Sequence, residues 1–483
     1  MDQGSEANIR PSVRFLNDGD VRAVHSAALE ILERTGVIVY EQEALDLLQS
    51  SGSKVSEKNR VRIPPHLVAE AVESAPDEIA IYDRKGAPAM FLEGTNSYWG
   101  PGSDTPFILD SYTGERRQTC LRDVEQVSVL VDALPNLDFL MCMGVAHELP
   151  QSVADKYHFV SMVSNTTKPI VFTASSRENL ADIHQMASQV AGGASRLRER
   201  PFVIHYTEPV APLIHPKDSL EKMLFCVEKG IPVIYSSATT AGQNGPATLA
   251  GALALSCARI LSGIVIGQLK RKGAPMIVTM HASSMDPRSA IHTYASPEHV
   301  ICQAAAKDLC NHYGLPTFGR AGCTDAKALD QQAAFEAGYE ILMQALCGEN
   351  LIHDVGYVES GLAASWDALV MCNEFIGAAK RVVEGFRLSK ETLALDLIDR
   401  AGPSGHFLAE PHTVEHFREE FWLPGLLDRD NFHSWVEKGR TTLLDRAKAA
   451  VKHTLATHTP EPLSPSLAED LAGLATQDHG RDK

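Results

Sequence analysis

Residues 217–237, KDSLEKMLFCVEKGIPVIYSS, contain the structural unit that decides the fold. Apolar residues at helical spacing predict a helix over 217–229. Gly230 suits the left-handed residue that ends a helix, and Pro232 suits the first position of a strand, where its missing N–H is tolerated. An apolar run follows at 233–237, so the stretch predicts a helix, a turn and a strand in that order.

The same unit recurs through the middle of the chain. A proline precedes each of six apolar or β-branched runs, at 137–144, 170–175, 202–207, 233–237, 276–281 and 317–322. Two further runs, at 96–100 and 350–354, bring the predicted strands to eight. The runs are nearly continuous in apolar residues, as expected for parallel strands covered on both faces. Glycines that precede the prolines, at 230, 273 and 314, are expected to cap the preceding helices.

Helical patterns lie between these runs, near residues 120–133, 152–166, 177–192, 217–229, 246–268, 296–313, 329–347 and 364–386. A strand–helix unit repeated eight times closes most naturally into a (β/α)8 TIM barrel. An open doubly wound sheet is the alternative, and it is disfavoured because no G-x-G-x-x-G segment follows the first strand.

The flanking regions predict additions to this barrel, which gives four parts in all. They are an N-terminal cap at 1–93, the barrel at 94–387, a helical extension at 388–456 and a mobile tail at 457–483 with one short helix. The cap combines three short helical patterns with a pair of strands at 78–92, and a further hairpin is expected at 107–118. The aromatic segment at 416–435 is expected to pack on the body or on a second subunit.

Composition argues against several classes of function. The chain has 44 Lys plus Arg against 61 Asp plus Glu, a net charge of -17, and no concentrated basic face for nucleic acid. Its nine cysteines are scattered without a C-x-x-C pair, which favours reduced thiols over disulfides. The polar N-terminal segment and the lack of an 18-residue uncharged apolar stretch predict a soluble, cytoplasmic protein without contact to a membrane.

The carboxyl ends of the strands carry the chemistry in barrels of this kind. A metal hydrolase of this class needs two histidines one residue apart at the first strand end, where this chain has Tyr98-Trp99-Gly100, so no metal site is expected. A Schiff-base enzyme needs a lysine at a strand end, and the nearest, Lys327, is expected to open a helix. The chain also has neither a nucleophile elbow nor a phosphate-binding loop.

Five aromatic residues near strand ends predict a cage for a quaternary ammonium ion, which is attracted to ring faces. They are Tyr98, Trp99, Tyr206, Tyr235 and Tyr357. Aromatic residues at such positions also serve as packing, so only their convergence would support a cage. Arg320 follows a strand, and if it points inward it offers a fork for a carboxylate. A cage together with a fork describes a betaine.

Long, ordered segments of the chain resemble the trimethylamine methyltransferase family, in particular its members without pyrrolysine. They are LEILERTGV (29–37), NRVRIPPHLV (59–68), SYWGPGSD (97–104), ILDSYTGERR (108–117), TTKPIVF (166–172), SSATTAGQNGPATLAGALAL (236–255), YGLPTFGRAGCTDAKALDQQAAFEAGYEILMQALCGENLIHDVGYVESGL (313–362) and FWLPGLLDRDNF (421–432). The similarity extends from about residue 11 to residue 450.

The resemblance implies a barrel that moves a methyl group from a methylated amine to the cob(I)alamin of a separate corrinoid protein, with no tightly bound cofactor of its own. Founding members use pyrrolysine on trimethylamine, but every position here is one of the ordinary twenty amino acids. The expected substrate is therefore a quaternary amine such as glycine betaine, proline betaine or carnitine.

The resemblance also suggests roles for individual residues. His353 and Asp354, from the I-H-D segment, are the candidates for contact with the corrinoid, with Asp354 orienting the histidine ring. A buried structural histidine is the alternative. The candidates for binding substrate are Tyr98, Trp99, His205, Tyr206, Glu208, His281, Arg320 and Tyr357. A homo-oligomer is expected. A barrel that binds a betaine or a related metabolite without methyl transfer remains the second hypothesis.

Overall fold

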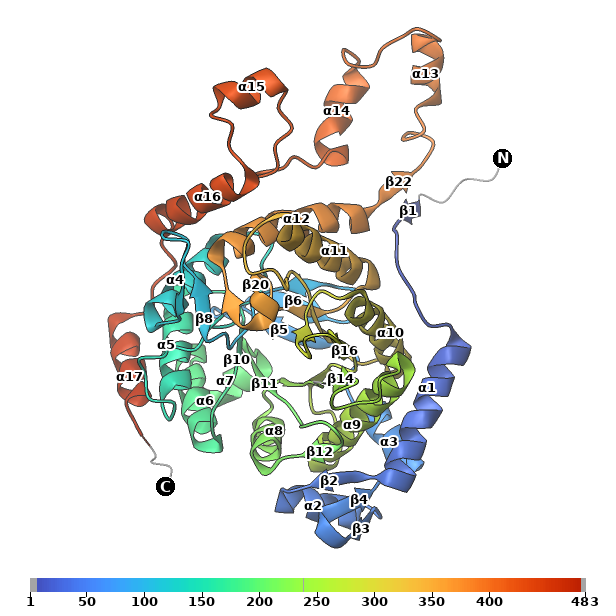
Figure 1. Cartoon of the computed structure of the whole chain (residues 1–483), viewed down its shortest axis with the longest axis vertical. Coiled ribbons are helices and arrows are strands. Elements are labelled where there is room, and N and C mark those ends of the chain that lie inside the picture. The colour runs from blue at the N-terminus through green and yellow to red at the C-terminus, as the bar shows by residue number, and fades with distance from the viewer. Residues whose placement is uncertain (1–6, 238, 479–483) are drawn as a thin grey trace.

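The computed structural model describes residues 7–237 and 239–478, and Figure 1 looks down onto a ring of strands enclosed by helices. Eight parallel segments form the ring. In chain order they are β7 (Tyr98–Trp99), residues 139–141, β10 (Ile170–Phe172), β11 (Val203–Thr207), β13 (Val233–Tyr235), β15 (Met276–Val278), β18 (Phe318–Arg320) and β19 (Leu351–His353). The run predicted as a strand at 137–144 forms only isolated bridges.

Hydrogen bonds join each segment of the ring to the next, so that the ring is closed. Strands β10, β11, β13 and β15 pair in parallel, as do β18, β19 and β7. The Val278 amide donates to the Pro316 carbonyl at 3.0 Å and so joins β15 to β18. The Trp99 carbonyl accepts from the Phe139 amide at 3.3 Å, and the Leu140 amide donates to Pro169 at 2.9 Å. The chain thus has the closed (β/α)8 order that the repeated unit predicted.

Successive side chains along each strand point alternately into the ring and out toward the helices. One apolar cluster contains a side chain from every segment of the ring and fills its interior. From the ring it takes Tyr98, Phe139, Met141, Val171, Ile204, Tyr206, Ile234, Ile277, Phe318 and Leu351. The neighbouring strand residues belong instead to the larger cluster between the ring and the helices.

Helices surround the ring in the predicted order. They are α4 (Leu121–Ala133), α5 (Ala154–Asn165), α6 (Arg177–Ala191), α7 (Ala194–Glu199), α8 (Lys217–Lys229), α9 (Leu249–Lys270), α10 (Pro297–Tyr313), α11 (Gln331–Cys347) and α12 (Trp366–Glu384). Gly230 and Gly314 are left-handed C-caps, as predicted. Gly273 is not a cap, because α9 ends at Lys270 and the glycine forms a separate turn.

Helix α9 is long and apolar enough to cross a membrane by composition alone. Most of it is buried inside the protein, with 78% of its most apolar 18-residue window enclosed. It is therefore a core helix of this fold.

The N-terminal region covers one side and the amino-terminal end of the ring. Its elements are β1 (Ala7–Ile9), α1 (Asp18–Glu30), a π-helical turn (Ile31–Thr35), β2 (Val37–Val39), α2 (Gln42–Ser50), β3 (Lys54–Ser56), a 3-10 turn (Glu57–Asn59), β4 (Arg60–Arg62), α3 (Pro65–Ser74), β5 (Ile79–Tyr82) and β6 (Pro88–Leu92). Strands β5 and β6 form the predicted hairpin, and four of its buried side chains join the interior cluster. Strand β12 (Ile214–His215) extends the β2–β4–β3 sheet.

Short strands also fold over the carboxyl end of the ring. They are β8 (Phe107–Leu109), β9 (Arg116–Gln118), β14 (Thr239–Ala241), β16 (Ala282–Met285), β17 (His292–Thr293), β20 (Tyr357–Val358) and β21 (Ala363–Ala364), with a 3-10 turn at Glu359–Gly361. Strands β8 and β9 form the predicted hairpin at 107–118, whereas the sequence did not indicate the others.

After α12 the chain leaves the body and returns. This region contains β22 (Phe386–Leu388), α13 (Leu395–Ala401), α14 (Pro411–Glu420), α15 (Phe432–Glu437), α16 (Leu443–Thr457) and α17 (Pro465–Ala475). Helix α17 is the predicted short helix of the tail, but the expectation of a mobile tail is wrong for residues 457–478. Leu471, Leu474 and Ala475 are buried where α17 packs against α5 and α6. Residues 479–483 lie outside the described residues.

Candidate active site at the carboxyl end of the ring

Polar side chains replace apolar ones on the inner face at the carboxyl end of the ring. Arg320 lies two residues after Phe318, His353 two after Leu351 and Glu208 two after Tyr206. Because alternate strand residues share a face, and because Phe318, Leu351 and Tyr206 belong to the interior cluster, these polar groups continue the inner face. The end of the interior that receives the connecting loops is therefore charged.

The ring of His353 is held in place from two sides. It stacks on Phe318 with 3.9 Å between ring centroids, and its Nδ1 lies 2.6 Å from the Gly319 carbonyl oxygen. A carbonyl can only accept, so Nδ1 carries the proton and Nε2 keeps its lone pair. Burial lowers the pKa of His353 to about 3, so the ring is neutral at physiological pH.

Asp354 does not orient this ring, contrary to the expectation from the sequence. Its Oδ1 is 3.5 Å from His353 Nε2, which is longer than a good hydrogen bond, whereas the Gly319 carbonyl makes a short contact. Asp354 has a positive φ of 66°. Such a backbone costs free energy in an ordinary residue and often marks a functional position.

Three carboxylates influence one another at this end of the ring. Burial raises the pKa of Glu208 to about 7; the charges of Asp104 and Asp354 add to the shift, and Arg259 opposes it. Burial also raises the pKa of Asp354 to about 7, against the effect of Arg320. Asp104 remains accessible to solvent, yet partial enclosure by protein and the charge of Asp354 raise its pKa. Such a group of acids attracts a cation.

Gly102 allows these acids to approach closely. A Cβ atom at this position would lie 2.2 Å from Asp354 Oδ1 and 2.3 Å from the Tyr357 hydroxyl oxygen. The Tyr357 hydroxyl in turn accepts a hydrogen bond from the Asp104 amide at 3.0 Å. Only glycine therefore fits between the first and the last strand ends of the ring.

Arg320 brings a positive charge to the same group. Its guanidinium lies over the Tyr294 ring, 3.8 Å from the centroid, and Nη2 donates to the Tyr294 carbonyl at 3.3 Å. Among the residues that the structure describes, none accepts a hydrogen bond from its buried Nε. Arg320 is thus held in place with a donor still available for an anionic group.

A second buried arginine, Arg259 of α9, lies behind Glu208. Its Nη2 donates to Ser237 and, at 3.0 Å, to Thr239, whereas Nε and Nη1 have no partner in the described part of the chain. Ser236, next to Ser237, donates its amide to Thr207, the residue before Glu208. The positive charge of Arg259 therefore favours the ionised form of Glu208.

The predicted aromatic cage does not assemble. Trp99 and Tyr235 alternate with interior residues, and both pack in the outer cluster against the helices. Tyr98 lies inside the ring, but its hydroxyl accepts from the Phe91 amide of the hairpin that closes the opposite end. Tyr357 is almost fully buried. Its hydroxyl nevertheless lies beside Asp104 in the charged group. Tyr206 also keeps the predicted place, and its hydroxyl donates to Glu208.

Two of the predicted histidines differ in position. His205 points outward, because its neighbours Ile204 and Tyr206 point inward, and its ring centroid is 5.2 Å from that of Phe172. It is fully buried and has no place at the mouth. His281 is partly exposed, yet its enclosure by protein lowers its pKa well below the usual value, and the nearby charge of Arg320 adds to the shift. His281 therefore belongs to the charged group.

Reasoning from the sequence gave no role to Asp104, although it placed this residue at the first strand end, and it left Gly102 and Tyr294 out of the candidate site. The SYWGPGSD segment held a signal for the first two, since a glycine pair followed by an acid comes directly after the first strand. Tyr294 had no such signal, because it follows the β16–β17 hairpin, which periodicity did not reveal.

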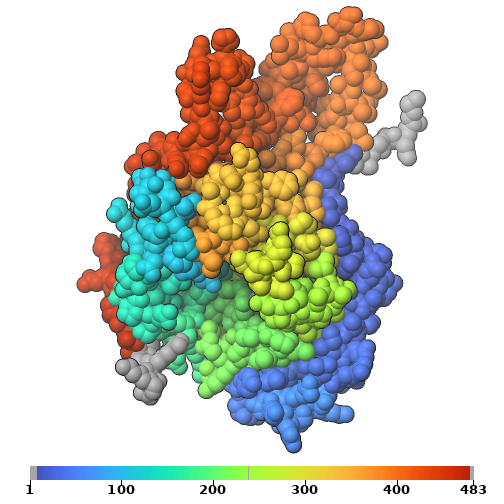
Figure 2. Space-filling model, viewed as in Figure 1, coloured from blue at the N-terminus to red at the C-terminus, as the bar shows by residue number. Residues whose placement is uncertain are grey.

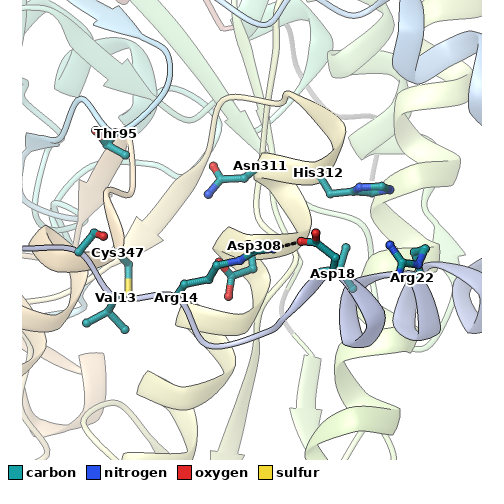
Figure 3. Close-up of a pocket in the computed structure, with 11 residues that line it drawn as sticks. Val13, Arg14, Asp18, Arg22, Thr95, Asp308, Asn311, His312 and Cys347 are labelled. Atoms are coloured by element: carbon teal, nitrogen blue, oxygen red, sulfur yellow. Dashed lines mark hydrogen bonds and ion pairs between the residues drawn. The ribbon is translucent and has the colours of Figure 1, made fainter.

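Two hollows of about 580 Å³ are lined by residues outside this charged group. One adjoins the end of β10 and includes Thr173 and Ser175. The other lies on the outer wall between the N-terminal arm and α10 (Figure 3). There Arg14 pairs with Asp18, and Asp308 accepts from the amides of Phe15 and Leu16 at 2.7 Å. These groups satisfy one another and attach the arm to the body.

No group of three or more His, Cys, Asp or Glu side chains suited to a metal ion occurs within residues 7–237 and 239–478. All nine cysteines are free, and eight of them are buried. The charged group is made of carboxylates, an arginine and imidazoles.

Comparison with known proteins places this geometry in context. Residues 3–478 match the family described as trimethylamine methyltransferase (MTTB). The trimethylamine methyltransferase MttB of Desulfitobacterium hafniense (strain DSM 10664 / DCB-2) is 31% identical over 462 residues, covering 95% of this chain and 93% of that protein. The glycine betaine methyltransferase of Desulfitobacterium hafniense (strain Y51) is 29% identical over 469 residues, covering 97% of each.

Among solved structures, the monomethylamine methyltransferase MtmB of Methanosarcina barkeri superposes with a TM-score of 0.53 at 10% identity, covering 92% of this chain and 88% of that one. This likeness supports the barrel fold. The match to the family model spans nearly the whole chain, and the chain therefore belongs to the trimethylamine methyltransferase family, whose members transfer methyl groups from methylated amines.

Proposed function

We propose that this enzyme removes a methyl group from a betaine-like quaternary amine and delivers it to the cob(I)alamin of a separate corrinoid protein. One observation carries the proposal: Asp104, Glu208 and Asp354 influence one another at the same end of the ring as Arg320. A betaine joins a permanent cation to a carboxylate, and this group of residues offers the complementary charges.

The charge of the substrate makes the bond to the methyl group breakable. Cobalt(I) of the partner supplies an electron pair that forms the bond to the methyl carbon. The N–C bond breaks, and its electron pair stays on nitrogen. Because a quaternary nitrogen is already positive, it leaves as a neutral tertiary amine and no proton has to be moved. Free trimethylamine would need activation first, and the chain contains no pyrrolysine to provide it.

In this proposal, the residues of the chain bind and orient the substrate. The carboxylates hold the ammonium group, with the face of Tyr206 beside it. Arg320 takes the carboxylate through its available Nε donor. Held at both ends, the substrate can present one methyl group toward the opening, and the gain in rate comes from alignment and exclusion of water.

His353 and Asp354 are proposed to act on the side where the corrinoid approaches. A neutral His353 with an unprotonated Nε2 can accept a hydrogen bond or approach a metal, which an imidazolium cannot do. Its stacking on Phe318 and its contact with Gly319 fix the direction of that lone pair. Asp354, with a pKa near 7, can hold or release a proton beside it.

The candidate substrates are glycine betaine, proline betaine and carnitine. The test is to incubate the purified protein with each amine and a reduced corrinoid protein, and to follow methylation of cobalt by absorbance. We expect turnover of at least one quaternary amine and none of trimethylamine. Comparable turnover of trimethylamine would contradict the proposal.

The second candidate function is a barrel that binds a betaine without methyl transfer. The same group of charges would serve it equally well, because a binding protein and an enzyme recognise the substrate with the same contacts. Calorimetric binding of a betaine, together with no methyl transfer to any reduced corrinoid carrier, would favour this function.

A further inference from the structure

Among the described residues, Arg320 has a strand partner on one side only. On that side β18 pairs with β19, and the pairing continues to Arg320 and His353. On the other side β15 ends at Val278, and the bridge between the two strands joins Val278 to Thr317. Because Arg320 is buried, its remaining backbone groups need a hydrogen-bond partner that is not a strand.

The side chain of Gln303, in α10, takes the place of the missing strand. The Arg320 amide donates to Gln303 Oε1 at 2.8 Å, and Gln303 Nε2 donates to the Arg320 carbonyl at 2.9 Å. Gln303 is fully buried. A carboxamide carries one acceptor and one donor group, so this single side chain satisfies both backbone groups of Arg320 as a neighbouring strand would.

The segment that leads into α10 holds the other end of Arg320. The guanidinium lies over the ring of Tyr294 and donates to its carbonyl. Asp325 fixes this segment in turn, because its carboxylate accepts from the amides of Tyr294 and Ala295 at 2.8 and 3.4 Å. Figure 2 shows the segments near residue 290, in yellow, at the front of the molecule. Helix α10 and the segment before it therefore hold the arginine at its backbone and at its guanidinium.

The buried neighbours of Arg320 on the helices do not neutralise its charge. His299, one turn before Gln303 on α10, is fully buried, and burial lowers its pKa well below the usual value. Glu340 of α11 is also fully buried, and burial raises its pKa well above the usual value, against the effect of Arg320. Both side chains are therefore uncharged at neutral pH, and the positive charge of Arg320 is left for a ligand.

We infer that Gln303 is a positioning residue, which sets Arg320 to receive the carboxylate of the substrate and so maintains a preference for carboxylated quaternary amines over choline. The inference rests on the proposed function, in which Arg320 binds that carboxylate. A guanidinium binds a carboxylate well only in the correct geometry. Without Gln303, two buried backbone groups of Arg320 lose their partners, and the end of β18 has to shift to find others.

Calorimetric titration with glycine betaine and with choline tests this inference. The wild-type protein should bind betaine more tightly, and Gln303→Met should reduce that preference about tenfold, because a small displacement of a binding group is costly. A purely structural role would lower both affinities alike. The matched control is Gln344→Met in α11, since Gln344 is equally buried and its amide has no partner in the described part of the chain. This control should keep the preference.

A further variant applies if Gln303→Met does not fold. Gln303→Glu keeps the shape of the side chain and, when protonated, both hydrogen bonds. Its preference for betaine, relative to the wild type at the same pH, should therefore fall as pH rises. A constant ratio would overturn the inference.

Hydrogen exchange adds a readout that needs no substrate. In peptides that contain residues 318–322, the Arg320 amide should exchange at least about tenfold faster in Gln303→Met than in the wild type or in Gln344→Met. Unchanged exchange overturns the inference. A betaine preference that survives in Gln303→Met overturns it as well and leaves the proposed function intact. Equal affinity of the wild-type protein for betaine and choline instead contradicts the proposed function, together with this inference.

Discussion

The two ends of the ring are built from the same eight segments, yet one is apolar and closed while the other is charged. At the amino-terminal end, Ile79, Ile81, Met90 and Leu92 of the β5–β6 hairpin complete the interior cluster. At the carboxyl end, Glu208, Arg320 and His353 occupy the equivalent inward positions. The comparison shows that the apolar closure and the candidate site lie at opposite ends of one core, as is usual for this fold.

Two tyrosines illustrate the difference. Tyr98 and Tyr206 both point into the ring, but the Tyr98 hydroxyl bonds to the amide of Phe91 at the closed end, whereas the Tyr206 hydroxyl donates to Glu208 at the charged end. The partner of the hydroxyl, and not the residue type, therefore distinguishes packing from a place in the candidate site.

The largest effect should come from weakening the closed end. Ile81→Ala removes a fully buried side chain of the hairpin and should lower the free energy of unfolding by about 2–5 kcal/mol, through lost burial and the cavity left behind. Substrate affinity of the folded variant should not change. Denaturant unfolding and calorimetric titration measure the two quantities.

The matched control for this experiment is Val55→Ala on β3, where the side chain is exposed and little stability should be lost. If Ile81→Ala lowered substrate affinity without lowering stability, the assignment of stability to the closed end and of substrate binding to the charged end would be incorrect.

At the charged end, Arg320→Leu should weaken binding of a carboxylated betaine by about 1.5–3 kcal/mol, the usual cost of losing a charge-assisted contact. Choline, which has no carboxylate, should be affected much less. The control is Arg288→Leu, because Arg288 is highly exposed and pairs only with Asp286.

His353→Ala should show the opposite pattern. We expect nearly unchanged substrate affinity and slower methylation of cobalt, measured at saturating substrate. Loss of substrate binding in His353→Ala, together with normal binding of betaine in Arg320→Leu, would reverse the two assignments.

A smaller effect should distinguish the two faces of the strands. Tyr206→Ala should weaken substrate binding by about 1–2 kcal/mol, the range for a cation beside a ring, whereas Tyr206→Phe keeps the ring and should lose less. Trp99→Phe should leave affinity unchanged, because Trp99 packs against the helices. Calorimetry on the three variants provides the comparison, and equal losses for Tyr206→Ala and Trp99→Phe would contradict the assignment of faces.

The smallest effect should be the dependence of binding on pH. Because the pKa values of Glu208 and Asp354 are raised to about 7, both are partly protonated at neutral pH, and one of them must ionise to hold a cation. Affinity should therefore rise about tenfold from pH 6 to pH 8, the change expected for one such group. Glu208→Gln should weaken this dependence, and Arg259→Gln should shift its midpoint to higher pH.

The raised pKa values of Glu208 and Asp354 make substrate affinity rise with pH, but they make the free energy of unfolding fall with pH. Between about pH 4 and pH 7 the native state binds more protons at these acids than the unfolded state does, so these two groups make stability fall as pH rises through that window. Asp354→Asn removes one such group, and its unfolding free energy should vary less between pH 5 and pH 7 than that of the wild type. An identical pH profile would mean that the Asp354 pKa is not raised.

The sequence by itself determined the ring. Five of the six proline-led apolar runs form strands, and the sixth, at 137–144, joins the ring through isolated bridges. The runs are apolar because a parallel strand between two layers is covered on both faces, and amphipathic helices with glycine caps pack around such strands. The position of Arg320, Glu208 and His353 at strand ends followed from the same local pattern. The family segments, which are long and ordered, identified the class of enzyme.

Only the tertiary structure decided which strand-end residues meet. Alternation along a strand points neighbours such as Tyr206 and His205 to opposite faces of the sheet. Which of the two points into the ring is decided by the register of the closed ring, and no local sequence pattern reveals that register. The approach of Asp104 to Asp354 across Gly102 joins residues about 250 positions apart, and Tyr294 reaches Arg320 from a hairpin without a clear period. The sequence predicted the helical extension after α12, but not that residues 386–442 would lie largely exposed, because exposure is a property of what a segment packs against and not of its composition.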